Sequence, residues 1–411
     1  MKLNLDMLLK NLIKNCPKKF RHTKVSGLSS DTRTIKKGNL FFALRGSKFD
    51  GNKYIKEAIY KGACAVISNK KKNNFTKIIF KKNVHKSLVN ACQNYFKDKP
   101  KNIIAVTGTN GKSSVADFFH QFLTLNKIPV ASIGTLGLKI KNFKKLNLTS
   151  PDIITLHRTL NRIKKLKIND VIIEASSHGL IQKRLDGLKF RIGIFTNFTQ
   201  DHLDYHKTMK KYLDAKFILF KKLMEKNSFI IASKKLNVIN KLKKIALNKK
   251  IKINFSDNFL FDKVKNHNKL VGDFQMQNLE MSALACTILG IPKKKIINQF
   301  NKIKNLKGRL EQAKELPNRS KVFIDYAHTP DAIETVIKAL IKRFKSNVTL
   351  VFGCGGERDI NKREIMGKIA DRYCNKIYIT DDNPRNENPK KIRNQIKKYI
   401  KKSKRLEIAN R

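Results

Sequence analysis

The stretch 101–120, KNIIAVTGTNGKSSVADFFH, decides the fold of the central part of the chain. It opens with an apolar, β-branched run at 103–106, which predicts a buried strand. A glycine-containing loop follows at 107–113, and apolar side chains then recur at helical spacing from Val115 to Phe122. Strand, loop and helix in this order form the context of a phosphate-binding loop, because the amide groups that begin the helix point towards a bound anion. The stretch therefore predicts a nucleotide-binding loop within an α/β sheet.

The polar residues of this loop have distinct expected roles. Lys112 would neutralise the β- and γ-phosphates of the nucleotide, and the hydroxyl of Ser113 would hold Mg²⁺. The usual pattern has a further glycine at the position of Val106, so the loop is a shortened variant. The alternative is a strand–helix turn in which glycine and serine serve only as turn and cap. The other nucleotide-binding residues predicted in the loop are Thr107, Gly108, Thr109, Asn110 and Gly111.

The composition limits the classes of protein to consider. A chain of 411 residues with 41% apolar residues can build two or three domains. The net charge of +58 alone would suggest nucleic acid, but the lysines are spread along the chain, so we expect no nucleic-acid partner. The 6 cysteines form no CxxC pair, which favours a reducing cytoplasm. We also expect no signal peptide and no membrane span, because no apolar run approaches the ~18–20 residues that a span requires.

The order of predicted elements indicates an α/β protein with three domains, at 1–95, 96–305 and 306–411. In the central domain, strands alternate with helices, which is typical of a mostly parallel sheet. Ligands bind beyond the C-terminal ends of such strands, and polar clusters follow the predicted strands at 171–173 and 192–195. The third domain has predicted strands at 322–325, 348–352 and 376–380, helices at 331–344, 362–373 and 390–402, and the start of a further strand at 405–408.

A series of short motifs, taken together, resembles the Mur ligase family. The motifs are TGTNGKSS (107–114), LTSPD (148–152), EASSHGL (174–180), FTNFTQDHLDYH (195–206), YLDAKFILF (212–220), GRLE (308–311), DYAHTPDA (325–332), FGCGGERD (352–359) and DDNPR (381–385). The resemblance implies a central P-loop-type sheet between a small UDP-substrate-binding N-terminal domain and an incomplete Rossmann-like C-terminal domain that binds an amino acid. It further implies a cytoplasmic, ATP-dependent ligase of peptidoglycan synthesis, active in cell wall biogenesis, cell shape and cell division.

The chemistry that the resemblance implies is amide formation through an acyl phosphate. Several anionic groups meet in such a reaction, so Mg²⁺ is an expected cofactor beside ATP. The resemblance places Ser113, Glu174, His202 and Lys216 around the metal, with Lys216 as N6-carboxylysine, and it makes Lys112, Glu174, His202 and Lys216 the catalytic residues. Two alternatives stay open: an ordinary surface lysine at 216, and a zinc pair formed by His202 and His206.

Further substrate contacts follow from the same resemblance. ATP is expected to contact Asn278 with its adenine, Arg309 with a phosphate and Asp325 with its ribose. The short hydroxyl and amide side chains expected around the UDP-sugar peptide would equally suit turns. The residues implied for this substrate are Ser30, Thr32, Ser47, Lys48, Phe49, Thr149, Ser150, Ser176, Gln182 and Arg184.

The tetrapeptide Asp382, Asn383, Pro384, Arg385 resembles the signature of family members that add meso-diaminopimelate to UDP-MurNAc-L-Ala-D-Glu. Arg385 can grip the distal carboxylate of diaminopimelate through two hydrogen bonds, with Arg358 as a second basic contact. Relatives that add L-lysine replace this arginine, and they are the alternative. The protein is expected to act as a monomer.

The end of the chain departs from the family pattern. Family members continue for several tens of residues beyond the position of Arg411, and that tail carries a Gly-Lys-Gly-His-Glu-type motif. We therefore expect a C-terminal truncation, with ATP and the UDP substrate bound but ligation impaired. The corresponding alternative is a non-catalytic relative that binds UDP-muramyl peptide.

Overall fold

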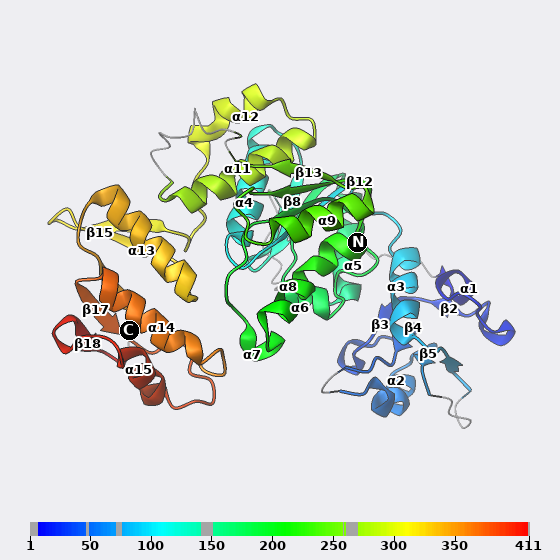
Figure 1. The fold of residues 1–411 in the computed structure, drawn as a ribbon. Helices are drawn as coiled ribbons and strands as arrows, with labels where there is room; N and C mark the ends of the chain where they lie inside the picture. Colours follow the sequence, from blue (N-terminus) through cyan, green and yellow to red (C-terminus); the bar gives the residue numbers. More distant parts are fainter. Residues whose placement is uncertain are drawn as a thin grey trace. The chain divides into compact units, whose positions relative to one another are not determined.

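The computed structural model describes residues 7–46, 49–70, 76–140, 151–257, 259 and 270–409 (Figure 1). The chain divides into two compact units. Unit 1 comprises Met1–Lys101, Ser150–Asn169 and Gln182–Lys189, and unit 2 comprises Asn102–Thr149, Asp170–Ile181 and Phe190–Arg411. The division into three domains at 95 and 305 stays a prediction, because the structure separates only these two units.

Unit 1 is built on a 4-stranded parallel sheet in the order β3-β4-β5-β6. Along β4, Leu40 and Phe42 pack into one apolar cluster and Phe41 into another, because successive side chains of a strand point to opposite faces. Both faces of the sheet are therefore covered, as in other parallel sheets. The elements are β1 (Met7–Leu8), α1 (Leu9–Leu12), β2 (Lys24–Val25), β3 (Gly27–Ser29), β4 (Asn39–Phe42), α2 (Ile55–Tyr60), β5 (Ala65–Ser68), β6 (Ile78–Phe80), α3 (Val84–Tyr95) and α5 (Ile153–Lys165).

A buried histidine makes the stability of unit 1 depend on pH. His157 of α5 is 0% exposed, and its Nε2 lies 3.0 Å from the carbonyl oxygen of Asp186. Burial lowers the pKa of His157 to about 4, so the folded chain binds this proton less readily than the unfolded chain does. The contribution of neutral His157 to the stability of unit 1 is therefore complete above about pH 6.5, the pKa of histidine in the unfolded chain. This contribution falls as the pH drops towards 4.

We expect the His157→Gln variant to lose less stability than the wild type on acidification. The difference in free energy of unfolding between the two proteins should change by about 1 kcal/mol per pH unit between pH 6 and 4.5. Urea unfolding monitored by circular dichroism at several pH values measures this difference. If the free energies of unfolding of the two proteins changed equally with pH over this range, the prediction would be contradicted.

Unit 2 contains a 7-stranded sheet in the order β13-β12-β11-β7-β10-β8-β9, in which only β9 runs antiparallel to its neighbour. This confirms the predicted α/β class with a mostly parallel sheet. Because β7 lies between β10 and β11, the loops that follow these three strands meet at one edge. The elements are β7 (Asn102–Thr107), α4 (Lys112–Leu125), β8 (Val130–Gly134), β9 (Gly137–Ile140), β10 (Asp170–Glu174), α6 (Ser177–Ile181), β11 (Phe190–Phe195), α7 (Leu203–His206), α8 (Met209–Ile218), β12 (Met224–Ala232), α9 (Ile239–Lys249), β13 (Lys252–Phe255), α11 (Asp273–Ile288) and α12 (Lys293–Gln299).

Helix α4 fixes the phosphate loop against the core of unit 2. Val115, Phe118 and Phe122 are fully buried, as their helical spacing predicts, and they join the same apolar cluster as Leu279 of α11. The hydroxyl of Ser282 in α11 donates to the carbonyl of Val115 at 2.9 Å. The packing of α4 against the core therefore fixes the start of the helix, whose backbone amides would point towards a bound anion.

The C-terminal part of unit 2, from Gly308 onward, has a hairpin of β14 and β15 and a 3-stranded parallel sheet in the order β16-β17-β18. The strand predicted at 322–325 thus pairs with β14 and stands outside the parallel sheet, whose third strand is β18. The last helix ends at Lys397, earlier than predicted, because a turn and a 3₁₀ segment at Lys402–Lys404 precede β18. The elements are β14 (Glu311–Glu315), β15 (Lys321–Ile324), α13 (Pro330–Phe344), β16 (Thr349–Phe352), α14 (Asn361–Tyr373), β17 (Lys376–Ile379), α15 (Pro389–Lys397) and β18 (Arg405–Glu407).

Across the described ranges of both units, no helix combines the length and the apolar composition that crossing a membrane requires.

Candidate active site

The loop between β7 and α4 depends on its two glycines. Gly108 has φ +148° and Gly111 has φ +83°, a region that residues with a side chain rarely adopt. A Cβ atom on Gly108 would collide with the hydroxyl of Thr196, and one on Gly111 would lie 2.5 Å from the side-chain oxygen of Asn278. Close approach of neighbouring groups, as well as backbone conformation, therefore demands glycine at both positions.

The polar residues after β11 hold the phosphate loop in place. The backbone amide of Asn110 donates to Oδ1 of Asn197 at 2.8 Å, and the hydroxyl of Thr196 donates to the carbonyl of Asn110 at 2.6 Å. Thr109 donates through its hydroxyl to the carbonyl of Thr199 at 3.1 Å. These three partners, Thr196, Asn197 and Thr199, belong to the motif at 195–206, but sequence reasoning gave them no role of their own.

Ser113 and Glu174 come together at the carboxyl end of β10. The Ser113 hydroxyl donates to Oε2 of Glu174 at 3.1 Å, and the Thr135 hydroxyl donates to the same oxygen at 3.1 Å. The backbone amide of Thr135 donates to Oε1 of Glu174, also at 3.1 Å. A hydroxyl and a carboxylate are oxygen donors of the kind that Mg²⁺ prefers, so this pair fits the metal that the resemblance implies. Thr135, which orients the carboxylate, was not predicted.

Lys216 lies inside unit 2, which excludes the alternative of a surface lysine. The residue is 1% exposed, its Nζ donates to the carbonyl of Gly108 at 2.7 Å, and the ammonium lies 4.2 Å from the ring centroid of Tyr212. Burial, followed by the nearby charge of Lys112, lowers the pKa of Lys216 well below its usual value. An uncharged amine is what reaction with CO₂ requires.

His202 is held by its neighbour Asp201. The His202 residue has φ +54°, its backbone amide donates to Oδ1 of Asp201 at 2.8 Å, and its Nε2 lies 3.2 Å from Oδ2. Burial lowers the pKa of His202 to about 3, although Asp201 opposes the shift. The ring of His178 lies 4.8 Å away, between centroids.

The zinc alternative finds no support in the geometry. Nε2 of His206 lies 3.0 Å from the hydroxyl of Ser177, so this ring nitrogen already has a partner. Among the residues that the structure describes, no three or more His, Cys, Asp or Glu side chains are grouped so as to hold a metal ion. Of the four residues that the resemblance places around the metal, Ser113 and Glu174 lie together, whereas His202 and Lys216 have other partners.

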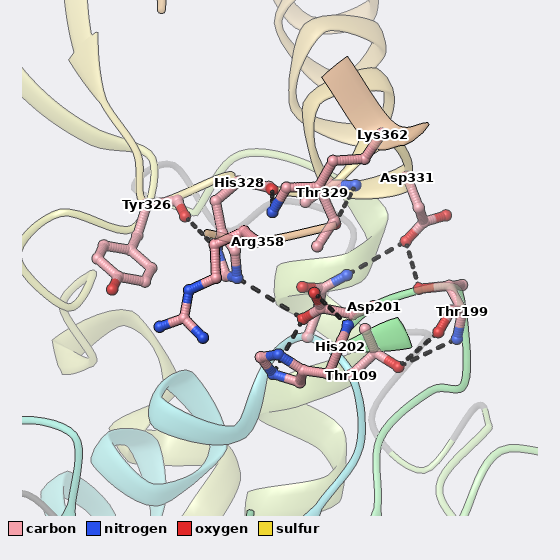
Figure 2. Close-up of polar contacts among 12 residues, drawn as sticks. Thr109, Thr199, Asp201, His202, Tyr326, His328, Thr329, Asp331, Arg358 and Lys362 are labelled. Atoms are coloured by element: carbon pink, nitrogen blue, oxygen red, sulfur yellow. Dashed lines mark hydrogen bonds and ion pairs between the residues drawn. The ribbon is translucent and has the colours of Figure 1, made fainter. Parts of the chain in front are cut away.

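The C-terminal part of unit 2 contacts the phosphate-loop side directly (Figure 2). Asp331 accepts hydrogen bonds from Nδ2 of Asn110 and from the hydroxyl of Thr199, both at 3.3 Å. Nε2 of His328 lies 3.7 Å from Oδ2 of Asp201, and Nζ of Lys362 donates to the carbonyl of His328 at 2.9 Å. Burial opposes the ionised form of Asp201, but the nearby His328 and the surrounding positive charge lower its pKa.

A pocket of about 120 Å³ opens beside the phosphate loop and brings the predicted ATP residues Asn278, Arg309 and Asp325 together. Asp325 accepts hydrogen bonds from the backbone amides of Leu310 and Ala327, each at 2.7 Å. Burial raises the pKa of Asp325. The pocket also contains Tyr326, whose ring lies 4.6 Å from the guanidinium carbon of Arg309 and offers a flat apolar face. The lining residues are Asn110, Gly111, Ser114, Asn197, Phe274, Gln275, Gln277, Asn278, Arg309, Asp325, Tyr326, Ala327, Asp331, Ala332, Thr335 and Val336.

The residues predicted for the other two substrates are placed as follows. Arg385 has φ +51° and donates through Nη1 to the carbonyl of Gly356 at 2.6 Å, and Nη1 of Arg358 lies 4.0 Å from Oδ2 of Asp204. Ser30, Thr32, Phe49, Gln182 and Arg184 belong to unit 1 and Ser176 to unit 2. Ser47, Lys48, Thr149 and Ser150 lie outside the described residues. The roles of all these residues stay predictions.

Comparison with known proteins decides the family. The chain matches the Mur ligase family catalytic domain at 24–109, the Mur ligase middle domain at 106–300 and the Mur ligase glutamate ligase domain at 308–411. It is 38% identical to the UDP-N-acetylmuramoyl-L-alanyl-D-glutamate–2,6-diaminopimelate ligase of Rickettsia bellii (strain RML369-C), over 95% of this chain and 87% of the relative. The chain belongs to the Mur ligase family. The enzyme of the same description from Rickettsia montanensis is 40% identical, over 97% of this chain and 88% of the relative.

Solved structures agree with the family fold. A structure of a UDP-N-acetylmuramoyl-L-alanyl-D-glutamate–2,6-diaminopimelate ligase superimposes with a TM-score of 0.71 at 26% identity, over 99% of this chain and 89% of that chain. The MurF ligase from Thermotoga maritima in complex with ADP has a TM-score of 0.61 at 17% identity, over 92% of this chain and 87% of that chain, and shows the likeness of fold alone. The predicted Mur ligase architecture is thereby confirmed.

The expected C-terminal truncation stays a prediction. The glutamate ligase domain is matched from residue 308 through residue 411, the last residue of the chain. The alternative of a truncated, non-catalytic relative is likewise still a prediction.

Proposed function

We propose that this chain is an ATP-dependent ligase that joins meso-diaminopimelate to UDP-MurNAc-L-Ala-D-Glu through an amide bond in peptidoglycan synthesis. The observation that carries the proposal is the pocket at which the phosphate loop meets Asn278, Arg309 and Asp325. Diaminopimelate as the incoming amino acid is supported by Arg385 in the same unit and by the names of relatives at 38% and 40% identity. The cytoplasmic location and the monomeric state are parts of the same proposal.

The reaction has to activate a carboxylate, which is a poor electrophile. A carboxylate oxygen of the D-Glu attacks the γ-phosphorus of ATP while the bond to the β-phosphate oxygen breaks, which yields an acyl phosphate and ADP. The amine of diaminopimelate then attacks the acyl carbon, loses a proton and expels inorganic phosphate. The chain mainly has to position these groups and to stabilise their negative charge.

Lys112 changes its partners when ATP binds. In the structure, its ammonium donates to the carbonyls of Gly108 and Thr109, at 3.0 and 2.7 Å. Phosphate oxygens carry negative charge and accept stronger hydrogen bonds than these neutral carbonyls do. Burial lowers the pKa of Lys112, and the phosphates would favour its charged form again.

Ser113 and Glu174 are the residues proposed to hold Mg²⁺, with Thr135 orienting the carboxylate of Glu174. The bound ion would supply positive charge against the γ-phosphate and the reacting carboxylate. Lys216 is proposed to carry a carboxyl group: its neutral Nζ attacks CO₂ and loses a proton, which converts a neutral amine into an anion next to the loop carbonyl of Gly108.

We expect this modification to be visible without any assay of activity. The protein equilibrated with ¹³C-labelled bicarbonate should give one carbamate signal in ¹³C NMR, and the Lys216→Arg variant should lack it, because arginine has no amine of lowered pKa. Lys221, on the following turn, provides the control, because Lys221→Arg should keep the signal. A signal that survives in Lys216→Arg would assign the carbamate to another group.

Phosphate release from ATP tests the proposed function. With UDP-MurNAc-L-Ala-D-Glu present, we expect diaminopimelate to support phosphate release and L-lysine or L-alanine to support at least about 100-fold less, because neither carries the distal carboxylate that Arg385 would bind. Release that is faster with L-lysine would favour the lysine-adding alternative. No release with any amino acid would contradict the ligase.

A further inference from the structure

Two loops in the C-terminal part of unit 2 carry the residues expected to contact the incoming amino acid. Loop A, residues 353–359, follows β16, and loop B, residues 380–388, follows β17. The two strands are parallel neighbours, so both loops leave the same edge of the sheet. The backbone amide of Gly356 donates to the carbonyl of Asn383 at 2.9 Å, and a Cβ atom on Gly356 would collide with the carbonyl of Pro384. The loops therefore dock backbone against backbone.

A single buried arginine ties these loops together. Arg363 of α14 is 0% exposed, and its Nη1 and Nη2 donate to Oε2 and Oε1 of Glu387 in loop B, at 2.8 and 3.0 Å. Nη2 also donates to the carbonyl of Gly355 in loop A at 3.1 Å, and Nη1 donates to Oε1 of Gln395 in α15 at 2.7 Å. The guanidinium group thus joins loop A, loop B and α15.

Glu387 adds a second link between the loops. Its Oε1 accepts a short hydrogen bond from the backbone amide of Glu357 in loop A. The hydrogen bonds from Arg363 lower the pKa of Glu387, so the carboxylate is ionised at neutral pH. Both of its oxygens are engaged, and the Arg363 side chain is fully enclosed, so neither group is available to a substrate.

The position of Arg385 depends on the loop that this pair supports. Nη1 of Arg385 donates to the carbonyl of Gly356 at 2.6 Å, one residue away from the carbonyl that Arg363 holds. Within the described part of the chain, Nε and Nη2 of Arg385 donate no hydrogen bond to another residue, and the residue is exposed. These two nitrogens are therefore available to a carboxylate, in the fork geometry that arginine offers.

We propose that Arg363 and Glu387 are positioning residues that set the place of Arg385 and thereby the preference for an amino acid with a distal carboxylate. This inference rests on the proposed function. The paired hydrogen bonds between two planar groups fix both distance and angle, so a lysine at 363 cannot reproduce them although it keeps the charge. The pair acts through the loops and not on the substrate.

The test compares variants of the full chain by steady-state kinetics with diaminopimelate and with L-lysine. We expect Glu387→Gln and Arg363→Lys each to lower the kcat/KM for diaminopimelate by about tenfold, to leave the low kcat/KM for L-lysine within about twofold, and to leave the KM for ATP within about twofold. The matched control is Glu334→Gln, since Glu334 also accepts from a basic side chain, Lys338 at 2.6 Å, but on α13, away from both loops. The control should keep the wild-type preference.

The outcomes separate this inference from the proposed function. If the wild type releases no phosphate with diaminopimelate, the proposed function fails before any variant is compared. If the wild type is active and Glu387→Gln keeps its preference for diaminopimelate over L-lysine, with or without a lower Tm, the pair is only structural and the inference is overturned. An equal loss of preference in Glu334→Gln would overturn it too. If the Arg363→Lys variant fails to fold, the substrate preference of Glu387→Gln, in which a side chain of the same shape replaces the carboxylate, tests the inference alone.

Discussion

Replacing Lys112 with alanine is expected to reduce ATP consumption to background. Lys112 begins α4, and its ammonium already lies within hydrogen-bond distance of two carbonyls of the phosphate loop, Gly108 and Thr109. The phosphoryl group develops charge on its oxygens during transfer, and alanine leaves that charge without a fixed cation. We expect kcat to fall by about 10³-fold, equivalent to about 4 kcal/mol of transition-state stabilisation. Phosphate release at saturating substrates measures the loss.

The chain offers a matched control for Lys112→Ala. Nζ of Lys81 also donates to two backbone carbonyls, those of Lys14 and Asn15 at 2.8 and 3.1 Å, but it belongs to unit 1 and not to the unit that contains the phosphate loop. Lys81→Ala therefore removes the same kind of contact and should keep kcat within about twofold. If Lys112→Ala hydrolyses ATP as the wild type does, the phosphate loop does not serve the reaction and the proposed function fails.

The Gly111→Ala variant is expected to lose nucleotide affinity by about 100-fold, which corresponds to about 3 kcal/mol. One part of the loss is backbone strain, because an alanine at φ +83° costs about 1–2 kcal/mol. The other part is the contact with Asn278, whose side-chain oxygen would lie 2.5 Å from the new Cβ atom. Since Asn278 also lines the pocket, its displacement acts on the adenine site as well as on the loop. Calorimetric titration with ADP measures the affinity.

Gly290 separates these two parts of the loss. It has φ +102°, and a Cβ atom there would meet nothing within 4 Å, so Gly290→Ala introduces the strain without the collision. We expect Gly290→Ala to lower Tm by a few degrees and to leave ADP affinity unchanged. An unchanged ADP affinity in Gly111→Ala would show that the loop tolerates a side chain there, contrary to the geometry.

The local parts of the site could be predicted from the sequence. The strand at 103–106, the loop and the buried face of α4 follow from short-range periodicity and glycine placement, and the structure has them as predicted. Asn278, Arg309 and Asp325 are far apart along the chain, and only the family resemblance indicated that they share one site. Their meeting depends on how α11 and the C-terminal part fold back onto the loop, which no local pattern encodes.

The residues that the sequence did not reveal are those that position others. Thr135 donates to Glu174 only because β8 and β10 are neighbours in the sheet, and a threonine in a turn has no distinctive pattern of its own. Arg363 and Glu387 are 24 positions apart, and among 89 lysines and arginines a buried guanidinium cannot be told from a surface one. The pairing of β15 with β14 is similar, because periodicity predicts a strand but not its partner.

The contacts of Asp331 in Figure 2 have a thermodynamic consequence. One carboxylate oxygen accepts from Asn110, inside the phosphate loop, and from Thr199, which itself holds that loop. Binding of a nucleotide to the loop and attachment of α13 to the loop therefore involve the same segment of the chain. Linkage is reciprocal: any factor by which a bound nucleotide changes the equilibrium constant for attachment of α13 is also the factor by which attachment changes the affinity for the nucleotide. The hydrogen bond of Asp331 thus joins the first turn of the helix that begins at Pro330 to a loop more than 200 residues earlier in the chain.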